Sequence, residues 1–360
     1  MEQKILNLTK KLIKIPSIKN NTKALHKIIN FCGRYFVGKE FIIEKLESNR
    51  KPSLVVLFKK THSPELFLVG HLDVVEAEKS QFVPQKKGKR LYGRGAADMK
   101  GSCATMMVLM KDLGSFPLEK PSLGLILTTD EEIGGYDGVR YLLRDKKYSC
   151  KVAFVPDAGK NFKIITSEKG ILHFKMIAKG RAAHGSRPWQ GENAIDKLIV
   201  VYQRLRNVFP NPKNNNDWRI SLNLGKIQGG DAVNKVADFA EAYLDLRYPE
   251  NYNQKKIVRK IKKLASGLKI EILTGGMPFY TSKNNSYILK YHKICRQILK
   301  RAPSFIKHPA ASDARFFSEK KIPVILTAPI KGGEHGRYEW VDTESLEKLY
   351  NILKKFILEN

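Results

Sequence analysis

The stretch LGLILTTDEE, residues 123–132, decides how this chain is expected to fold. A continuous apolar run of strand length is typical of a strand buried on both faces of a parallel sheet. VAFVPD at 152–157 repeats this pattern, and GSCATMMVLMKDL at 101–113 has the length and composition of a buried helix. Ligands of such doubly wound α/β sheets gather beyond the carboxyl ends of the strands. We therefore expect a mostly parallel α/β sheet with a site at the acidic residues that end its strands.

The rest of the chain predicts two domains, because 360 residues exceed what one hydrophobic core usually holds. Helices are expected over 2–14 and 22–37, followed by strands at 40–46, 53–58 and 66–70. Between residues 169 and 277 the order becomes strand, helix, strand, strand, helix, strand, which is that of a ferredoxin-like α+β domain. After residue 278 the α/β pattern returns and ends in a helix over 344–358. We expect a catalytic domain over 1–168 and 278–360, interrupted by an inserted domain over 169–277.

The formal charge of +30 raises the question of nucleic acid, but the lysines are scattered over the whole chain. The basic residues of 255–263 fit the solvated face of an amphipathic helix, with an anion-binding patch as the alternative. No window approaches a membrane span, and residues 1–18 lack the apolar core of a signal peptide. The four dispersed cysteines predict reduced, mostly buried thiols. We expect a cytoplasmic protein that binds neither nucleic acid nor a membrane.

Five short stretches present the carboxylates and imidazoles that a pair of zinc ions needs. They are LVGHLDVV at 68–75, GRGAADMKG at 93–101, TTDEEIGG at 128–135, VPDAG at 155–159 and GGEHGRYEWV at 332–341. Each is weak evidence alone because His, Asp and Glu are common residues. Together they predict a two-metal hydrolase.

Spacing suggests a role for several of these side chains. His71 and Asp73 point to the same side of a strand, so one can ligate a metal while the other orients it. Two metals 3.5 to 4 Å apart need a bridging carboxylate, for which Asp98 is the candidate. A glycine-rich loop before a helix could also cradle a phosphate, but neither the P-loop nor the dinucleotide spacing is present.

Adjacent acidic residues at a strand end face different directions, which suits a division of labour between Glu131 and Glu132. We expect Glu132 to ligate a metal and Glu131 to take a proton from water as the general base. Asp157 and His335 complete the set, so each metal has the bridge, one carboxylate and one imidazole. Zinc lowers the pKa of water toward 7, which makes this arrangement suitable for hydrolysis.

At these residues the chain resembles the co-catalytic zinc amidohydrolases and exopeptidases of metallopeptidase family twenty. The family includes succinyl-diaminopimelate desuccinylase, acetylornithine deacetylase, aminoacylase, glutamate carboxypeptidase and several di- and tripeptidases. The resemblance covers essentially the whole chain. It implies one zinc at His71 and Asp157, another at Glu132 and His335, and a bridge at Asp98. It also implies Glu131 as base, Asp73 as the partner of His71, and a cis peptide after Asp98.

The inserted domain resembles the lid and dimerisation domain of that family, which implies a homodimer. His184 in GRAAHGSRPWQGENA resembles a histidine that stabilises the tetrahedral oxyanion. Asn234 in GGDAVNKVAD, Arg247 in LDLRYP and Arg315 in SDARFF resemble residues that bind the substrate, for which an Arg fork suits a carboxylate. The alternatives are a structural loop residue for His184, a turn residue for Asn234, and ion pairs for the arginines.

The resemblance implies hydrolysis of the amide bond in an N-acyl amino acid, and GRGAADMKGS and SDARF are close to desuccinylases. VPDAG and HGRYEWV instead look more like aminoacylases and peptidases, so a metal-dependent dipeptidase or carboxypeptidase is the alternative. We expect two Zn²⁺ ions, with Co²⁺ or Mn²⁺ as possible substitutes. A remote alternative is an inactive basic protein that binds nucleic acid.

Overall fold

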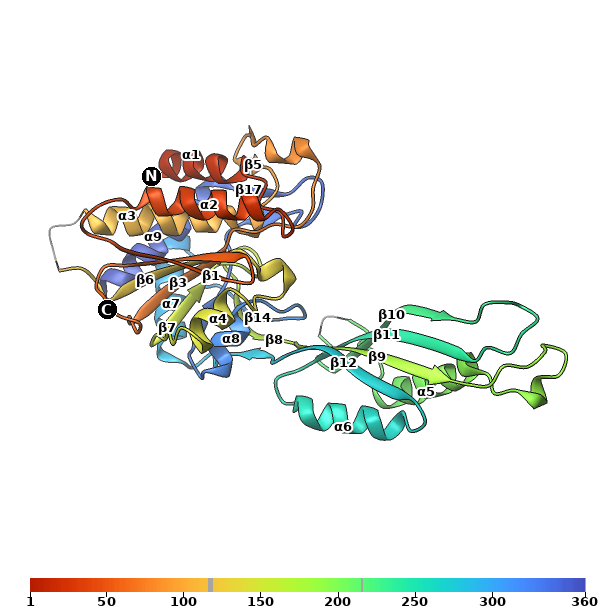
Figure 1. The fold of residues 1–360 in the computed structure, drawn as a ribbon. Coiled ribbons are helices and arrows are strands. Elements are labelled where there is room, and N and C mark those ends of the chain that lie inside the picture. Colours follow the sequence, from red (N-terminus) through yellow and green to blue (C-terminus); the bar gives the residue numbers. More distant parts are fainter. Residues whose placement is uncertain (116–118, 215, 360) are drawn as a thin grey trace. The chain divides into compact units, whose positions relative to one another are not determined.

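The computed structural model of the chain describes residues 1–115, 119–214 and 216–359. These residues divide into two compact units (Figure 1). The first unit contains Met1–Thr166, Tyr280–His308 and the chain from Ser312, and the second contains Ser167–Phe279 with Pro309–Ala311. The range expected for the inserted domain, 169–277, lies inside the second unit. The two ends of the described chain both belong to the first unit.

The first unit is built on a mixed sheet with the strand order β1-β2-β6-β3-β7-β15-β8-β13, and β14 pairs with β8. Its strands are β1 (Ile42–Ser48), β2 (Lys51–Leu57), β3 (Leu66–His71), β6 (Leu123–Thr128), β7 (Val152–Val155), β8 (Ile164–Glu168), β13 (Phe279–Tyr280), β14 (Phe305–His308) and β15 (Val324–Leu326). The central strands β6, β3, β7 and β15 are parallel. The pairs β1 with β2, β2 with β6, and β15 with β8 are antiparallel. The mostly parallel α/β sheet predicted from the sequence is therefore confirmed.

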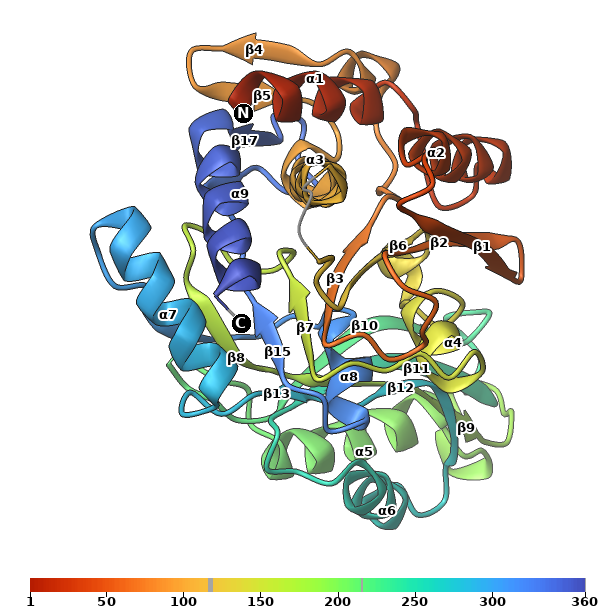
Figure 2. The same ribbon diagram turned by 90° about the vertical axis from the view of Figure 1, so that its left-hand side faces the viewer.

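Helices cover both faces of this sheet. They are α1 (Glu2–Ile13), α2 (Thr22–Tyr35), α3 (Gly101–Gly114), α4 (Val139–Arg144), α7 (Ser286–Leu299), α8 (Ala314–Glu319) and α9 (Thr343–Leu358). One face forms a core with α1, α2, α3, α7 and α9, and Figure 2 shows α3 end-on beside α1 and α9. The shorter helices α4 and α8 contact each other and lie on the opposite face. Nearly all residues of α3 are buried, which confirms the buried helix predicted from its apolar sequence.

A small antiparallel sheet with the order β16-β17-β5-β4 was not anticipated from the sequence. Its strands are β4 (Gln85–Lys87), β5 (Arg90–Tyr92), β16 (Lys331–Gly332) and β17 (Trp340–Asp342). Such short strands carry too few residues for a period of two to stand out. The sheet is important because β5 leads into the loop of Asp98, and β16 and β17 flank the loop of His335.

The second unit has the order strand, helix, strand, strand, helix, strand. Its elements are β9 (Gly170–Lys179), α5 (Ala194–Val208), β10 (Ser221–Gly229), β11 (Phe239–Tyr248), α6 (Gln254–Leu264) and β12 (Lys269–Gly276). The sheet is antiparallel with the order β10-β11-β9-β12, which is the ferredoxin-like order predicted from the sequence. Helix α6 buries Ile257 and Ile261 while its lysines face solvent, as expected of an amphipathic helix.

Three of the four cysteines are buried thiols and Cys150 is partly buried; within the described residues all four are free. Burial raises the pKa of the Cys103 thiol to about 12, so it is not a reactive thiolate. No helix in the described ranges has both the length and the apolar character needed to cross a membrane.

Candidate metal centre

Three neighbouring parallel strands bring the first candidate residues together. His71 is the last residue of β3 and lies in register with Thr128, the last residue of β6. Glu131 and Glu132 follow β6 directly, and Asp157 follows the end of β7 on the other side of β3. Parallel strands end at the same edge of a sheet, so the side chains that follow them converge there.

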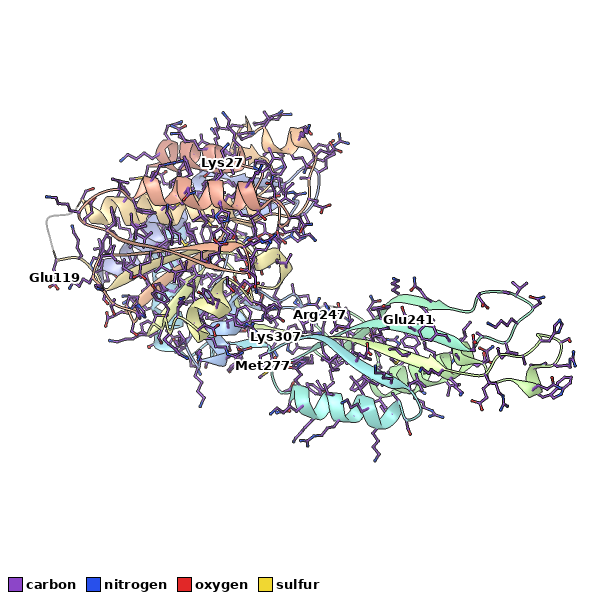
Figure 3. All side chains as sticks on the ribbon, in the orientation of Figure 1. Lys27, Glu119, Glu241, Arg247, Met277 and Lys307 are labelled. Carbon is purple, nitrogen blue, oxygen red and sulfur yellow. The ribbon has the colours of Figure 1, made fainter. Side chains whose placement is uncertain are left out.

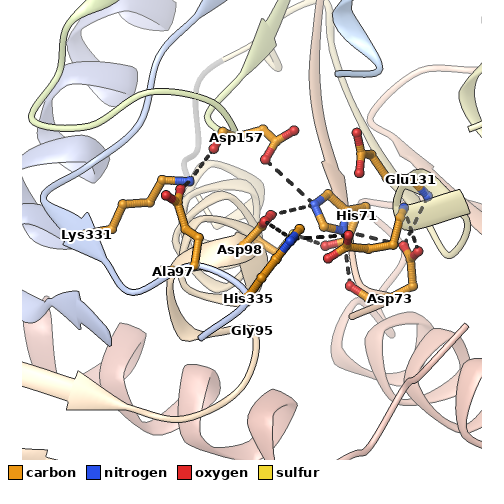
Figure 4. A network of polar contacts seen from close by, with 12 residues as sticks. His71, Asp73, Gly95, Ala97, Asp98, Glu131, Asp157, Lys331 and His335 are labelled. Carbon is orange, nitrogen blue, oxygen red and sulfur yellow. Dashed lines mark hydrogen bonds and ion pairs between the residues drawn. The ribbon is translucent and has the colours of Figure 1, made fainter. Parts of the chain in front are cut away.

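The first candidate ligand group consists of His71, Asp98 and Asp157, whose ligand atoms lie within 4.8 Å of one another. His71 Nε2 is 2.9 Å from Asp98 Oδ1 and 3.7 Å from Asp157 Oδ1 (Figure 4). His71 and Asp157 are nearly inaccessible to solvent. A buried imidazole that faces two carboxylates matches the donor set of a divalent cation such as zinc.

The second group consists of Asp98, Glu132 and His335 and meets the same distance limit. His335 Nε2 is 3.3 Å from Asp98 Oδ2 and 3.3 Å from Glu132 Oε2. Asp98 therefore belongs to both groups, and it faces each of them with a different carboxylate oxygen (Figure 4). The peptide bond between Asp98 and Met99 is cis, as the resemblance implied.

Asp73 connects the ends of β3 and β6. Its Oδ1 lies 3.4 Å from His71 Nδ1, on the side of the ring opposite the candidate metal position. The backbone N–H groups of Glu131 and Glu132 also donate to its carboxylate, at 3.3 and 3.0 Å. Asp73 is fully buried, so these contacts hold both the imidazole ring and the acidic loop in place.

Glu131 belongs to neither ligand group of the described residues, although its neighbour Glu132 does. Its side chain lies near His71 and Asp157 in Figure 4. Burial, followed by the negative charge of Asp157, raises the pKa of Glu131 well above its usual value. A carboxylate with a raised pKa accepts a proton more readily at neutral pH, which is what a general base requires.

The histidines and Asp98 shift one another's pKa in the metal-free chain. Burial disfavours charge on Asp98, but contacts with His335 and His71 hold its pKa well below the usual range. Burial also opposes protonation of His71, yet Asp157, Asp73 and Asp98 raise its pKa well above 6.5. Contacts with Asp98 and then Glu132 raise the pKa of His335 to about 10.

Three buried cationic or acidic residues of the site had no role in the sequence interpretation. Lys331 donates to the backbone carbonyl of Asp157 and lies 2.6 Å from Glu334 Oε1 (Figure 4). Arg94 and Glu339 form an ion pair of 2.6 Å beside the loops of Asp98 and His335. Arg94 and Glu339 lie inside two of the five stretches quoted from the sequence. The chain has 65 lysines and arginines, so the sequence does not show that Arg94 and Lys331 in particular are buried.

The predicted substrate-binding residues lie in different parts of the fold. Arg315, in α8, is buried and donates a 2.5 Å hydrogen bond to the carbonyl of Gly134, just after Glu132. His184 and Asn234 lie in neighbouring loops of the second unit, where the Gly185 N–H donates to the Asn234 carbonyl at 2.7 Å. Arg247 projects from β11, as does Glu241 (Figure 3), and its Nε lies 2.8 Å from Asp245 Oδ1. Their contact with substrate stays a prediction.

Comparison with known proteins identifies relatives over most of the chain. The family model described as peptidase family M20/M25/M40 matches residues 67–359. The succinyl-diaminopimelate desuccinylase of Xylella fastidiosa (strain M12) is 29% identical over 322 residues, which cover 82% of this chain and 84% of that protein. A probable carboxypeptidase of Aspergillus clavatus is 30% identical over 269 residues, which cover 68% of this chain and 62% of that protein.

A solved structure extends the comparison to the fold. The crystal structure of a tripeptidase from Staphylococcus aureus matches with a TM-score of 0.80 and 20% identity, over 99% of this chain and 98% of that one. At this identity the likeness concerns the fold alone. It includes both units, since nearly the whole chain is covered.

The matched range contains all five stretches, and the relatives and the ligand groups agree on one class of protein. That class is the metal-dependent hydrolases of amide or peptide bonds. Within it, the chain belongs to peptidase family M20/M25/M40. The family predicted from the sequence is confirmed, whereas the role of each site residue stays a prediction.

Metal binding should release protons from this site. The pKa of about 10 means that His335 is protonated at neutral pH in the metal-free chain, whereas a metal binds only neutral imidazole. We expect metal affinity to rise as the pH increases from about 6 to about 9, with proton release on binding. Titrating the metal-free protein with Zn²⁺ in weakly buffered solution containing a pH indicator measures this release.

His335→Asn should release about one proton fewer than the unaltered chain. His173→Asn is a matched control, because His173 pairs with Asp245 in the second unit and should leave the proton count unchanged. Equal release from all three proteins would contradict the proposed place of His335.

Proposed function

We propose that this chain is a di-zinc hydrolase that cleaves the amide bond of an N-acyl amino acid, in the manner of a desuccinylase or acetylornithine deacetylase. The observation that carries the proposal is the position of Asp98, whose two carboxylate oxygens face two imidazoles in two overlapping ligand groups. Such a shared carboxylate is the usual means of holding two metals close together. The similarity to a desuccinylase over 82% of the chain supports the substrate class.

In this proposal His71 and Asp157 hold one zinc, Glu132 and His335 hold the other, and Asp98 bridges them. Their chemistry fits zinc, which prefers imidazole and carboxylate donors, and Co²⁺ or Mn²⁺ are possible substitutes. When bound, the zinc ions supply Lewis acidity, which lowers the pKa of water and polarises the amide carbonyl. The buried Asp73 keeps the His71 ring oriented from its far side.

Glu131 is proposed as the general base. It takes one proton from water, so that the hydroxide oxygen can form a bond to the amide carbon. The carbon–nitrogen bond then breaks, and the same proton passes from Glu131 to the leaving amine. The raised pKa of Glu131 supports this exchange, because a carboxylate with a higher pKa is a stronger base toward a proton of water.

Substrate recognition is proposed for residues of both units. His184 would stabilise the negative charge that develops on the carbonyl oxygen, and Asn234, Arg247 and Arg315 would bind the substrate carboxylate. These roles rest on the family resemblance. The net charge of +30 supports an acidic substrate, because a basic field attracts anions. We propose the cytoplasm as the location of the enzyme, on the basis of the sequence.

A metal-dependent dipeptidase or carboxypeptidase is the second candidate. It is favoured by Asp157 in VPDAG and by the neighbours of His335, both of which look more like peptidases than desuccinylases. The 30% identity to a probable carboxypeptidase also supports it. A basic nucleic-acid-binding protein without activity is the remote alternative, and the complete ligand groups argue against it.

A substrate panel distinguishes these candidates. The protein loaded with Zn²⁺ or Co²⁺ should hydrolyse succinyl-diaminopimelate or acetylornithine faster than any dipeptide, measured as release of the free amine. Turnover of dipeptides alone would contradict the deacylase and support the peptidase. A chain that binds no metal but is retained on RNA in a salt-sensitive way would support the remote alternative.

Glu131→Gln should lower kcat by at least about 100-fold, because the amide cannot take a proton from water. Metal content should not change, since Glu131 belongs to neither ligand group. Initial rates and metal analysis of the same preparation check both statements. Glu132→Gln is the matched comparison and should lose metal. Loss of metal from Glu131→Gln instead would mean that the two glutamates have exchanged roles.

We also propose a homodimer that forms through the second unit. The family resemblance suggests it, and exposed apolar side chains on an outer strand and a helix support it. Ile227 on β10 is 48% exposed, and Ile199 and Val200 on α5 are 42% and 44% exposed. Strand β10 lies at one end of its sheet, where backbone groups can pair with a second copy.

Sedimentation should give twice the mass of one chain, and Ile227→Lys should reduce it to that of a monomer, because a buried charge weakens an apolar interface. Ile272→Lys is the control, since Ile272 is 41% exposed on β12, at the other end of the same sheet. A monomer at every concentration would contradict the proposed dimer.

A further inference from the structure

Arg94 and Glu339 form a buried ion pair that lies between two candidate ligands in the fold. Arg94 Nη1 is 2.6 Å from Glu339 Oε2, and the two side chains are 3% and 1% exposed. Arg94 precedes Asp98 by four residues, and Glu339 follows His335 by four. A buried ion pair contributes little net stability by itself, because desolvation offsets its attraction. Its other contacts therefore indicate what it does.

The Glu339 carboxylate holds the loop that carries Asp98. The Gly95 N–H donates to Oε2 at 3.0 Å, and the N–H groups of Ala97 and Asp98 donate to Oε1 at 2.9 and 3.1 Å. In addition, the Gly93 N–H donates to the Glu339 backbone carbonyl at 3.0 Å. Both carboxylate oxygens are thus occupied by the segment that leads to Asp98, including the backbone of Asp98 itself.

The Arg94 guanidinium holds the loop that carries His335. Its Nη2 donates to the backbone carbonyls of His335 and Gly336, at 3.0 and 3.2 Å. His335 needs such support, because its side chain is 55% exposed and its backbone has a φ of 61°. The planar fork of an arginine presents several donors in a fixed geometry, so Arg94 reaches the Glu339 carboxylate through Nη1 and two backbone carbonyls through Nη2.

We propose that Arg94 and Glu339 are positioning residues that hold Asp98 and His335 at the separation a metal ion requires. This inference rests on the proposed metal-dependent function and deepens it. His335 Nε2 and Asp98 Oδ2 lie 3.3 Å apart, although they come from loops far apart in the chain. Glu339 determines the backbone position of one loop, Arg94 that of the other, and their ion pair joins the two. Neither residue contacts the substrate or the metal in this role.

Glu339→Gln tests the proposal at the carboxylate. The amide replaces one acceptor by a donor, so either the Arg94 and Gly95 donors or the Ala97 and Asp98 donors lose their partner. We expect metal affinity to fall about 10- to 100-fold, as for other residues that orient metal ligands. Competition with a chelator measures the affinity for Zn²⁺, and the visible absorption spectrum of the Co²⁺-loaded protein reports the ligand geometry.

The matched control is Glu241→Gln. Glu241 is a partly buried carboxylate of the second unit that pairs with Lys175 and accepts from Tyr243 Oη at 3.0 Å. It carries the same functional group as Glu339, but its contacts with Lys175 and Tyr243 involve no candidate ligand. The Co²⁺ spectrum and the metal affinity of this variant should match those of the unaltered chain.

Arg94→Lys is the second test variant. It keeps the positive charge beside Glu339 but loses the fork that reaches His335 and Gly336. Because the hydrogen bonds of Glu339 to the Asp98 loop remain, we expect a smaller loss of metal affinity than in Glu339→Gln. If the pair acted on stability alone, both variants would lower the free energy of unfolding but would leave the Zn²⁺ affinity and the Co²⁺ spectrum of the folded protein unchanged.

The proposal is overturned if both variants fold and bind metal with the affinity and Co²⁺ spectrum of the unaltered chain. If Glu339→Gln does not fold, the Zn²⁺ affinity and the Co²⁺ spectrum of Arg94→Lys test the proposal instead. Loss of folding in both variants, judged by circular dichroism with and without metal, would assign the pair to stability and also overturn the proposal. An unaltered chain that binds no metal would instead contradict the proposed function.

Discussion

The candidate site depends on one carboxylate, that of Asp98, which faces an imidazole with each of its oxygens. One imidazole ends a central strand of the sheet, and the other lies in a loop of the small antiparallel sheet. The position of Asp98 therefore joins two parts of the first unit that share little backbone pairing.

Several acidic side chains lie close together beyond the ends of the parallel strands, so their negative charges must be neutralised by protons or by nearby cationic groups. Desolvation and mutual repulsion raise the pKa of Glu131, whereas imidazoles hold that of Asp98 low. Although burial opposes its charge, the nearby charges of Asp98 and Glu334 raise the pKa of Lys331, so that this buried lysine stays charged. The surroundings thus raise the pKa of one carboxylate and lower that of another, which suits Glu131 to proton transfer and Asp98 to metal binding.

Much of the fold follows from local patterns. The apolar runs of β6 and β7, the all-apolar helix α3 and the order of elements in the second unit are visible in the sequence, because buried strands and helices require these residues. The strands of the small sheet are two or three residues long, and no local pattern identifies them. They nevertheless lead into the loops of two of the candidate ligands.

The sequence by itself determined the family, the mostly parallel sheet and the residues that could ligate metal, since strand ends and ligand types are local properties. Only the tertiary structure decided which oxygen of Asp98 faces which histidine, because that depends on side-chain geometry. It also revealed the pair of Arg94 and Glu339, whose members lie 245 residues apart. In a chain with 65 basic residues, no composition or spacing tells a buried arginine from a solvated one. Burial is a property of the folded chain, and in the folded chain this ion pair contacts the backbone of the loops that carry Asp98 and His335.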